Sequence, residues 1–217
     1  QKTAYLCSAC GDDFPKWNGQ CPSCKEWGTL SEFKTTRKKN NNRIDLKDSR
    51  SLNDVLNTNP GDRICTGINE VDRVLGGGLL AGSLILLGGN PGVGKSTLAL
   101  HICSELDRKA LYISAEESEE QVALRAKRLN VKSENLFLSG ANELDGILNH
   151  LERIQPDLLI IDSIQTVMNS ELDSLPGSPS QIRDCGQRLL ETAKHRNVAI
   201  LIVGHVTKDG TIAGPKM

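Results

Sequence analysis

The chain has 217 residues, enough for one full core or for a small module joined to a larger core. Hydrophobic residues make up 38% and aromatic residues only 3%, so any core should be mainly aliphatic. With 26 basic and 27 acidic residues the net charge is −1, which excludes a globally basic nucleic-acid-binding protein and confines such a site to a local surface. No apolar run reaches the roughly 20 residues that cross a bilayer, and the N-terminus lacks the apolar core of a signal peptide. We expect a soluble cytoplasmic protein with no membrane partner.

Composition changes twice along the chain and predicts three segments. Residues 1–33 hold four clustered cysteines and both tryptophans, and we expect them to form a C4 zinc-finger module. Residues 34–59 are polar, with seven basic and two acidic residues between Lys34 and Arg50, which indicates a flexible basic linker. A solvated spacer and a nucleic-acid contact both stay open for this linker. From residue 60 to residue 217, short apolar runs alternate with helical patterns, as in an α/β domain.

The clustered cysteines form two Cys-x-x-Cys pairs that ten residues separate. Two residues between cysteines let a tight turn present both sulfurs to one ion, with backbone amides directed at the thiolates. Four thiolates match tetrahedral zinc at about 2.3 Å and leave no open position for catalysis. A unit of about 30 residues buries too little apolar surface by itself, so the metal should supply its folding energy. The predicted zinc ligands are Cys7, Cys10, Cys21 and Cys24.

Two other chemistries fit the cysteine pairs less well. A redox-active pair should open a helix in a strand–helix unit, and neither pair does. An iron site of the rubredoxin type stays open as the alternative to zinc. Trp17 and Trp27 lie between and after the pairs, and we expect them to pack around the metal-binding turns. Stacking of the two rings on nucleic-acid bases is the alternative for these residues.

Short runs of almost entirely apolar residues predict strands that are buried on both faces of a sheet. These runs span Leu84–Leu87, Ala110–Ile113, Leu136–Leu138, Leu158–Ile161 and Val198–Val203. Helical patterns separate them: one after Lys95, one over residues 119–129 with Ser118 and Gln121 spaced as a capping box, one over residues 143–154 and one over residues 181–195. Strands that alternate with helices predict a mostly parallel central sheet flanked by helices.

A phosphate-binding loop follows the first of these runs and precedes a helix, which is the context that the G-x-x-x-x-G-K-[ST] pattern requires. Its glycines let backbone N–H groups converge on the β-phosphate of ATP or ADP, and the helix N-terminus adds its dipole. The Lys95 ammonium should reach the β- and γ-phosphates, and the Ser96 hydroxyl should ligate Mg²⁺. The expected nucleotide-binding residues are Gly89, Asn90, Pro91, Gly92, Val93, Gly94, Lys95, Ser96 and Thr97.

Three further polar residues follow buried strands and should lie at the same edge of the sheet. Asp162 ends an apolar run in the Walker B pattern and would hold Mg²⁺ beside the phosphate loop, with Ser163 capping or orienting a neighbour. Glu116 is the candidate catalytic base that positions the attacking water. The alternative is an acidic first turn that only favours the helix dipole, formed by Glu116 with Glu117, Glu119 and Glu120. His205 is the candidate sensor of the γ-phosphate.

Several features coincide in this chain: the four-cysteine module, the basic linker, the phosphate loop, the glycine-rich stretch Asp72–Gly78 and the sequence Gly204–Lys208. Together they closely resemble the bacterial RadA (Sms) family of DNA repair proteins, which are RecA-like ATPases. The resemblance implies a DNA-dependent ATPase of homologous recombination and DNA repair, which forms a homohexameric ring and promotes branch migration as a helicase-like motor. It also implies single-stranded DNA, branched DNA intermediates and a RecA-type recombinase as partners.

The resemblance further predicts two loops that face the central pore of the ring and touch DNA, namely residues 169–180 and a loop that begins at Lys208. Family members continue with a Lys-Asn-Arg-Phe-Gly motif and a domain similar to that of Lon protease. We therefore expect residues 60–217 to be a C-terminally truncated RecA-like ATPase domain. Two other functions stay open: a replicative-type helicase without a recombination role, and a nucleotide-binding regulatory or adaptor module that recruits a protein partner through its zinc module.

Overall fold

The computed structural model describes residues 2–35, 49, 51–57, 63–131 and 134–205. The chain divides into two compact units, Gln1–Asp62 and Arg63–Met217. The first unit is built on a three-stranded antiparallel sheet in the order β2-β1-β3. Its strands are β1 Lys2–Cys7, β2 Asp13–Phe14 and β3 Leu30–Thr35.

The buried centre of the first unit is small, and both tryptophans lie outside it. The centre consists of Cys7, Cys21 and Leu30, with Tyr5, Phe14, Cys10 and Cys24 partly buried against them. Trp17 and Trp27 are 61% and 74% exposed, so the prediction that they pack around the metal-binding turns is wrong. Both rings lie beside Gly19 instead, within 3.8 Å of the position that a Cβ atom would occupy there. The four converging sulfurs take up the interior that the indole rings would have needed.

The segment expected to be a linker, residues 34–59, includes regular structure at both of its ends. β3 continues to Thr35. A short helix, α1 Leu52–Leu56, follows Ser51, whose hydroxyl accepts a hydrogen bond from the Asp54 amide at 3.1 Å. Residues 36–48, 50 and 58–62, which carry most of the basic side chains of this segment, lie outside the described residues. The flexible basic linker therefore stays a prediction.

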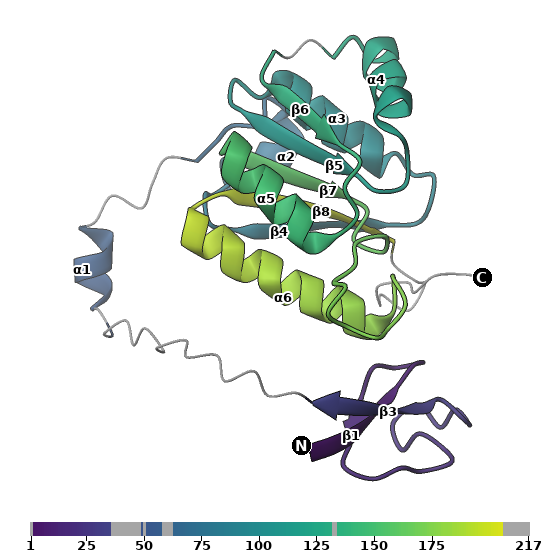
Figure 1. Ribbon diagram of the computed structural model, residues 1–217. Helices are drawn as coiled ribbons and strands as arrows, with labels where there is room; N and C mark the ends of the chain where they lie inside the picture. Colours follow the sequence, from purple (N-terminus) through teal and green to yellow (C-terminus); the bar gives the residue numbers. More distant parts are fainter. Residues whose placement is uncertain (1, 36–48, 50, 58–62, 132–133, 206–217) are drawn as a thin grey trace. The chain divides into compact units, whose positions relative to one another are not determined.

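The second unit is built on a five-stranded parallel sheet in the order β4-β8-β7-β5-β6 (Figure 1). Its strands are β4 Leu84–Gly89, β5 Ala110–Ser114, β6 Leu136–Ser139, β7 Leu158–Asp162 and β8 Ala199–His205. Its helices are α2 Asn69–Val74, α3 Lys95–Glu105, α4 Glu119–Arg128, α5 Leu144–Ile154 and α6 Pro179–Arg196. Helices α5 and α6 cover one face of the sheet, and α2 and α3 cover the other. The predicted fold class, a parallel sheet flanked by helices and preceded by a four-cysteine zinc ribbon-like module, is confirmed.

Side chains alternate between two buried clusters along the central strands. In β5, Leu111 and Ile113 join the cluster beneath α5 and α6, whereas Ala110 and Tyr112 join the cluster beneath α3. Among the buried members of these clusters in the described residues, Tyr112 is the only aromatic side chain. The rest of the core is aliphatic or small, as the low aromatic content predicts.

Strand burial differs between the centre and the edges of the sheet. Every residue of β5 and β7 is buried, as the apolar runs predict. In the edge strands, however, Leu86 of β4 is 48% exposed and Phe137 of β6 is 40% exposed, so the prediction of burial on both faces is wrong there. β4 and β6 are the two edges of the sheet, so each has a neighbouring strand on one side only and is less completely covered than β5 and β7.

Helix boundaries follow the expected capping signals closely. Ser118 and Gln121 form the predicted capping box at the start of α4. Helix α6 begins two residues earlier than predicted, because the Ser178 hydroxyl accepts a hydrogen bond from the Gln181 amide and Pro179 occupies the first turn. Helix α5 ends at Ile154, before Pro156, as predicted.

Candidate functional site

The predicted site residues meet at the carboxyl edge of the parallel sheet. His205, the last residue of β8, lies opposite Gly89, the last residue of β4. Asp162, the last residue of β7, lies opposite Ser114, the last residue of β5, and Glu116 follows two residues later. The strands β4, β8, β7 and β5 are successive neighbours in the sheet, and neighbouring strands are about 4.8 Å apart. The predicted site residues and the phosphate loop therefore lie close together at this edge.

The phosphate loop joins β4 to α3. Gly92 and Gly94 take positive φ angles of 78° and 95°, a conformation that side chains disfavour, and Gly94 is the residue that precedes α3. No side chain caps the start of α3. Its first backbone N–H groups therefore keep their capacity to bind an anion, and the helix dipole favours negative charge there. This is the chemistry that the nucleotide prediction requires.

The Lys95 side chain is hydrogen-bonded to the backbone of the phosphate loop. Its Nζ donates hydrogen bonds to the carbonyl oxygens of Gly89 at 2.9 Å and Asn90 at 2.8 Å. The same Nζ lies 3.2 Å from Nδ1 of His205. An ammonium can only donate, so Nδ1 is the acceptor, and the proton of a neutral imidazole lies on Nε2. The side chain of Lys95 is thus already held at the base of the phosphate site by groups that phosphate oxygens can replace.

Glu116 lies between Ser163 and His205. The Ser163 hydroxyl, which is fully buried, donates a hydrogen bond to Oε1 of Glu116. Nε2 of His205 lies 3.7 Å from the same oxygen. The Glu116 side chain is nevertheless 44% exposed, so a solvent molecule can reach it. Ser163 therefore orients Glu116, and His205 connects Glu116 to Lys95.

Asp162 has a partner that the sequence did not indicate. The hydroxyl of Tyr112, on the neighbouring strand β5, donates a hydrogen bond to Oδ2 of Asp162 at 2.5 Å. Burial, and then the negative charge of Asp162, raise the pKa of the Tyr112 hydroxyl far above its usual range. The hydroxyl consequently keeps its proton and acts as the donor. The one available signal in the sequence was a lone tyrosine in an otherwise aliphatic run, two residues before the strand end.

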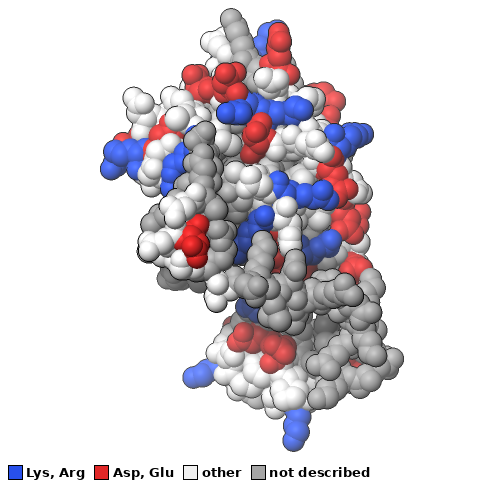
Figure 2. Space-filling model, turned by 90° about the vertical axis from the view of Figure 1, so that its left-hand side faces the viewer, with Lys and Arg blue, Asp and Glu red and all other residues white. Residues whose placement is uncertain are grey.

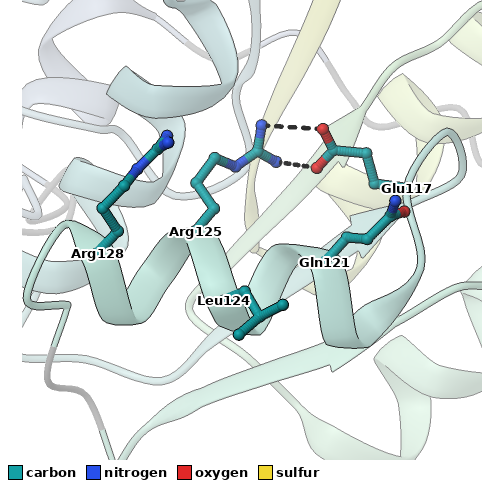
Figure 3. A pocket seen from close by; sticks show the side chains of 5 residues that line it. All are labelled: Glu117, Gln121, Leu124, Arg125 and Arg128. Carbon is teal, nitrogen blue, oxygen red and sulfur yellow. Dashed lines mark hydrogen bonds and ion pairs between the residues drawn. The ribbon is translucent and has the colours of Figure 1, made fainter.

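The three acidic residues that follow Glu116 have other partners. Glu117 pairs with Arg125 of α4 through both carboxylate oxygens, at 3.3 and 2.6 Å (Figure 3). Glu119 accepts a hydrogen bond from the Gly140 amide at 2.9 Å. A hydrogen bond from Ser118, and then one from its own amide, lower the pKa of Glu120 at the exposed helix start. Glu117, Glu119 and Glu120 therefore fasten the start of α4, and Glu116 is left at the sheet edge.

The four cysteines of the first unit form a compact sulfur cluster. The Sγ atoms of Cys7 and Cys24 are 3.6 Å apart, as are those of Cys10 and Cys21, and all four lie within 4.8 Å of one another. A regular tetrahedron with metal–sulfur bonds of about 2.3 Å has edges of about 3.8 Å. The donor set and its spacing thus fit one tetrahedral metal ion held by four thiolates.

Both cysteine pairs lie in the same type of turn. The carbonyl oxygen of Cys7 accepts a hydrogen bond from the Gly11 amide at 2.8 Å, and that of Cys21 accepts one from the Lys25 amide at 2.9 Å. Gly11 and Lys25 both have positive φ angles, 77° and 62°. Burial by itself raises the pKa of the Cys7 thiol, but hydrogen bonds with Thr29 and with backbone amides outweigh it and lower the pKa to about 6. The Cys10 thiol of the same turn shifts the other way, because burial raises its pKa to about 12. Metal binding would therefore have to displace the proton of Cys10.

The first predicted pore loop, residues 169–180, is shorter than expected because α6 begins at Pro179. Gln181, which is almost fully buried, holds the loop: its Oε1 accepts from the Asn169 amide at 2.8 Å, and its Nε2 donates to the carbonyl oxygens of Asn169 and Ser174. The second predicted loop, from Lys208 onward, lies outside the described residues. No helix among the described residues is both long and apolar enough to cross a membrane.

Comparisons with known proteins bear on both units. A family model described as an AAA domain matches residues 55–211, and one described as a rubredoxin metal binding domain matches residues 5–32. The DNA repair protein RadA of Haemophilus influenzae is 43% identical over 227 residues, covering 100% of this chain and 49% of the relative. RadA of Listeria monocytogenes is 42% identical (99% and 48%), and RadA of Rickettsia bellii is 46% identical (100% and 49%). The chain spans about half the length of the curated relatives it matches.

Proposed function

Because the chain belongs to the AAA domain family and matches RadA DNA repair proteins along its whole length, we propose that it is the RecA-like ATPase part of a DNA-dependent motor of DNA repair and homologous recombination. The observation that carries the proposal is the gathering of four groups at one sheet edge. These are the phosphate loop, Asp162, Glu116 and His205. Each group has a distinct task in the hydrolysis of ATP.

Nucleotide binding would use the phosphate loop, residues 89–97. Backbone amides at the start of α3 cradle the phosphates, and Lys95 exchanges the carbonyl oxygens of Gly89 and Asn90 for phosphate oxygens. Ser96 and Asp162 are the residues that would hold Mg²⁺, which neutralises phosphate charge when it is bound. Asp162 is a nearly buried oxygen ligand at the end of β7, which suits a hard cation of this kind.

Hydrolysis would use Glu116 as the base that orients the attacking water and accepts its proton. Ser163 holds Glu116 in place for this step. Nδ1 of His205 lies 3.2 Å from Nζ of Lys95, and Nε2 of His205 lies 3.7 Å from Oε1 of Glu116, so arrival of a γ-phosphate at Lys95 would be felt by His205. His205 is the last residue of β8 and precedes Lys208, where the second predicted pore loop begins, by three positions. This contact supports the role of a γ-phosphate sensor.

The four-cysteine module would hold a structural zinc ion. Four thiolates leave no coordination position for a substrate, and the module has little other core, so the metal supplies its folding energy. The family model carries the name of rubredoxin, an iron protein, and four cysteines can hold either metal. We favour zinc because Cys-x-x-Cys pairs of this spacing are typical of zinc ribbons. Reduced thiolates also fit a cytoplasmic location.

The proposal extends to DNA and to assembly. We propose single-stranded and branched DNA as substrates, a homohexameric ring that promotes branch migration, and a RecA-type recombinase as partner. On the face shown in Figure 2, acidic and basic side chains are interspersed, as expected for a net charge of −1. The first pore loop itself carries Glu171 and Asp173 and no basic residue before Arg183. DNA affinity must therefore come from a few local basic groups.

A second candidate function is an adaptor module that recruits a protein partner through the first unit. The exposure of Trp17 and Trp27 is the observation that favours it, because exposed aromatic side chains mark interaction surfaces. This candidate predicts ATP binding without any response of turnover to DNA.

The deciding experiment is the ATPase rate of the protein at its natural length, with and without single-stranded DNA. We expect DNA to raise turnover, and we expect Lys95→Ala to lower turnover by about 100-fold or more, because the variant loses a charge at the transferred phosphoryl group. Lys127→Ala, which removes an exposed lysine from α4, is the matched control and should behave as the unaltered protein. Turnover that ignores DNA would favour the adaptor function instead.

A further inference from the structure

We infer that Tyr112 is a positioning residue for magnesium-dependent nucleotide binding, because its hydroxyl fixes the carboxylate of Asp162 on the neighbouring strand. The inference deepens the proposed function and rests on it, since it requires Asp162 to act toward Mg²⁺ beside the phosphate loop. Tyr112 acts only through Asp162 and needs no contact with the nucleotide. Neither the phosphate-loop pattern nor the Walker B pattern includes this tyrosine.

The contact between the two side chains is short and enclosed. Oη of Tyr112 lies 2.5 Å from Oδ2 of Asp162. In the register of the sheet, Tyr112 lies opposite Ile160, so its hydroxyl reaches two residues along the same face to Asp162. Tyr112 is fully buried and Asp162 is 7% exposed. A carboxylate this far from water is costly unless it is hydrogen-bonded, and within the described residues Tyr112 supplies the hydrogen bond that its side chain receives.

The direction of the bond determines what it can do. A phenol donor on Oδ2 fixes the plane of the carboxylate and keeps it an acceptor, while Oδ1 receives no hydrogen bond from the described residues. A ligand oxygen on Oδ1, whether of an ion or of a water bound to it, would then meet a carboxylate with a set orientation. A residue that hydrogen-bonds to a metal ligand, without touching the metal itself, orients that ligand.

The ring of Tyr112 also connects Asp162 to the phosphate loop. It belongs to the buried cluster that contains Ala99, Leu100 and Cys103 of α3. Helix α3 begins at Lys95 and Ser96, the second of which is the other proposed Mg²⁺ residue. The position of the hydroxyl is therefore set by packing against the same helix that carries Ser96. One buried cluster thus includes both the ring that bonds Asp162 and residues of the helix that carries Ser96.

The test is a magnesium titration of nucleotide binding, which separates positioning from a merely structural role. We expect Tyr112→Phe to raise the Mg²⁺ concentration for half-maximal binding of a non-hydrolysable fluorescent ATP analogue by about 10- to 100-fold. Binding of the analogue in EDTA should change by no more than about twofold. Tyr5→Phe, at the only other tyrosine of the chain, makes the same chemical change in the first unit and should leave both values unchanged.

Combination with Asp162→Asn completes the test. Asp162→Asn should raise the same Mg²⁺ concentration, and adding Tyr112→Phe to it should change the value by no more than about twofold, because the hydroxyl acts through that carboxylate. Equal weakening in Mg²⁺ and EDTA, an unchanged magnesium requirement, full additivity with Asp162→Asn, or loss of folding in Tyr112→Phe would each overturn the inference. If the unaltered protein shows no magnesium-dependent binding, the proposed function fails first, and the inference fails with it.

Discussion

Four carboxylates lie within five residues of one another after β5, and the structure separates them by their partners. Glu117, Glu119 and Glu120 are engaged at the start of α4, whereas Glu116 faces Ser163 and His205 at the sheet edge. The division follows from geometry, because Glu116 is still close to the end of β5 and the chain then turns away to begin the helix. Glutamates that are close together in the sequence thus have different partners, and only Glu116 lies at the proposed site.

This separation predicts the effect of neutralising one carboxylate at a time. Glu116→Gln should lower the turnover of ATP by about 10²- to 10⁴-fold, the usual contribution of a general base, and should leave ATP bound. Glu120→Gln removes the same charge from the exposed helix start and should leave turnover nearly unchanged. Turnover measured by phosphate release, with binding measured separately, distinguishes the two. Normal hydrolysis by the Glu116 variant would mean that Glu116 belongs only to the helix start.

At the scale of the elements, the fold of the first unit depends more on its two cysteine-containing turns than on its small sheet. β2 has only two residues, and the buried centre consists mainly of the cysteines themselves. The turns at Cys7–Gly11 and Cys21–Lys25 repeat the same hydrogen bond, and both end on a residue with positive φ. We expect a module with so little apolar burial to fold because a metal ion joins its two halves.

Removal of one thiolate should therefore unfold the first unit and spare the second. Cys7→Ser should lose the metal, whereas Cys65→Ser, at an exposed cysteine of the second unit, should keep one ion per chain. Elemental analysis should identify zinc, and nucleotide binding by the Cys7 variant should persist, because the phosphate loop belongs to the other unit. Iron in protein purified under reducing conditions would contradict the assignment of zinc.

At the scale of the whole molecule, the net charge limits how the proposed DNA substrate could be bound. A net charge of −1 gives no long-range attraction, and the segment predicted to be the first pore loop, residues 169–180, is acidic. A motor that moves along DNA cannot depend on base identity, so the contacts should be made to the phosphate backbone. The basic candidates are Arg183, Lys208, Lys216 and the basic residues of segment 34–59.

Backbone contacts of this kind predict a strong response to salt without sequence preference. The logarithm of the affinity for single strands should fall with the logarithm of salt concentration, with a slope of about −0.7 for each phosphate contacted. Aromatic stacking by the first predicted pore loop should contribute little, because residues 169–180 include no Phe, Tyr or Trp. Titration of the natural-length protein with strands of different sequence at two salt concentrations measures both quantities. A flat salt response, or a strong preference for one sequence, would contradict the prediction.

The sequence alone determined the family, the parallel sheet flanked by helices, the phosphate loop and the four-cysteine module. Each depends on residues that are close in the chain or on a local periodicity: G-x-x-x-x-G-K-S before a helix, Cys-x-x-Cys turns, a capping box at Ser118 and apolar runs of strand length. The matches to RadA proteins and to the AAA domain confirm the resemblance. Local patterns of this kind depend only on residues that are close together in the chain, which is why they can be recognised without a structure.

Only the tertiary structure decided which distant side chains meet. Lys95 contacts His205 across 110 positions, Ser163 reaches Glu116 across 47, and Tyr112 reaches Asp162 across 50. These contacts follow from strand order, since β8 lies between β4 and β7, and β5 lies beside β7. Strand order is a property of the whole packed sheet and leaves no local mark on the sequence. The exposure of Trp17 and Leu86 has the same origin, because burial depends on what covers a residue and not on its own apolar character.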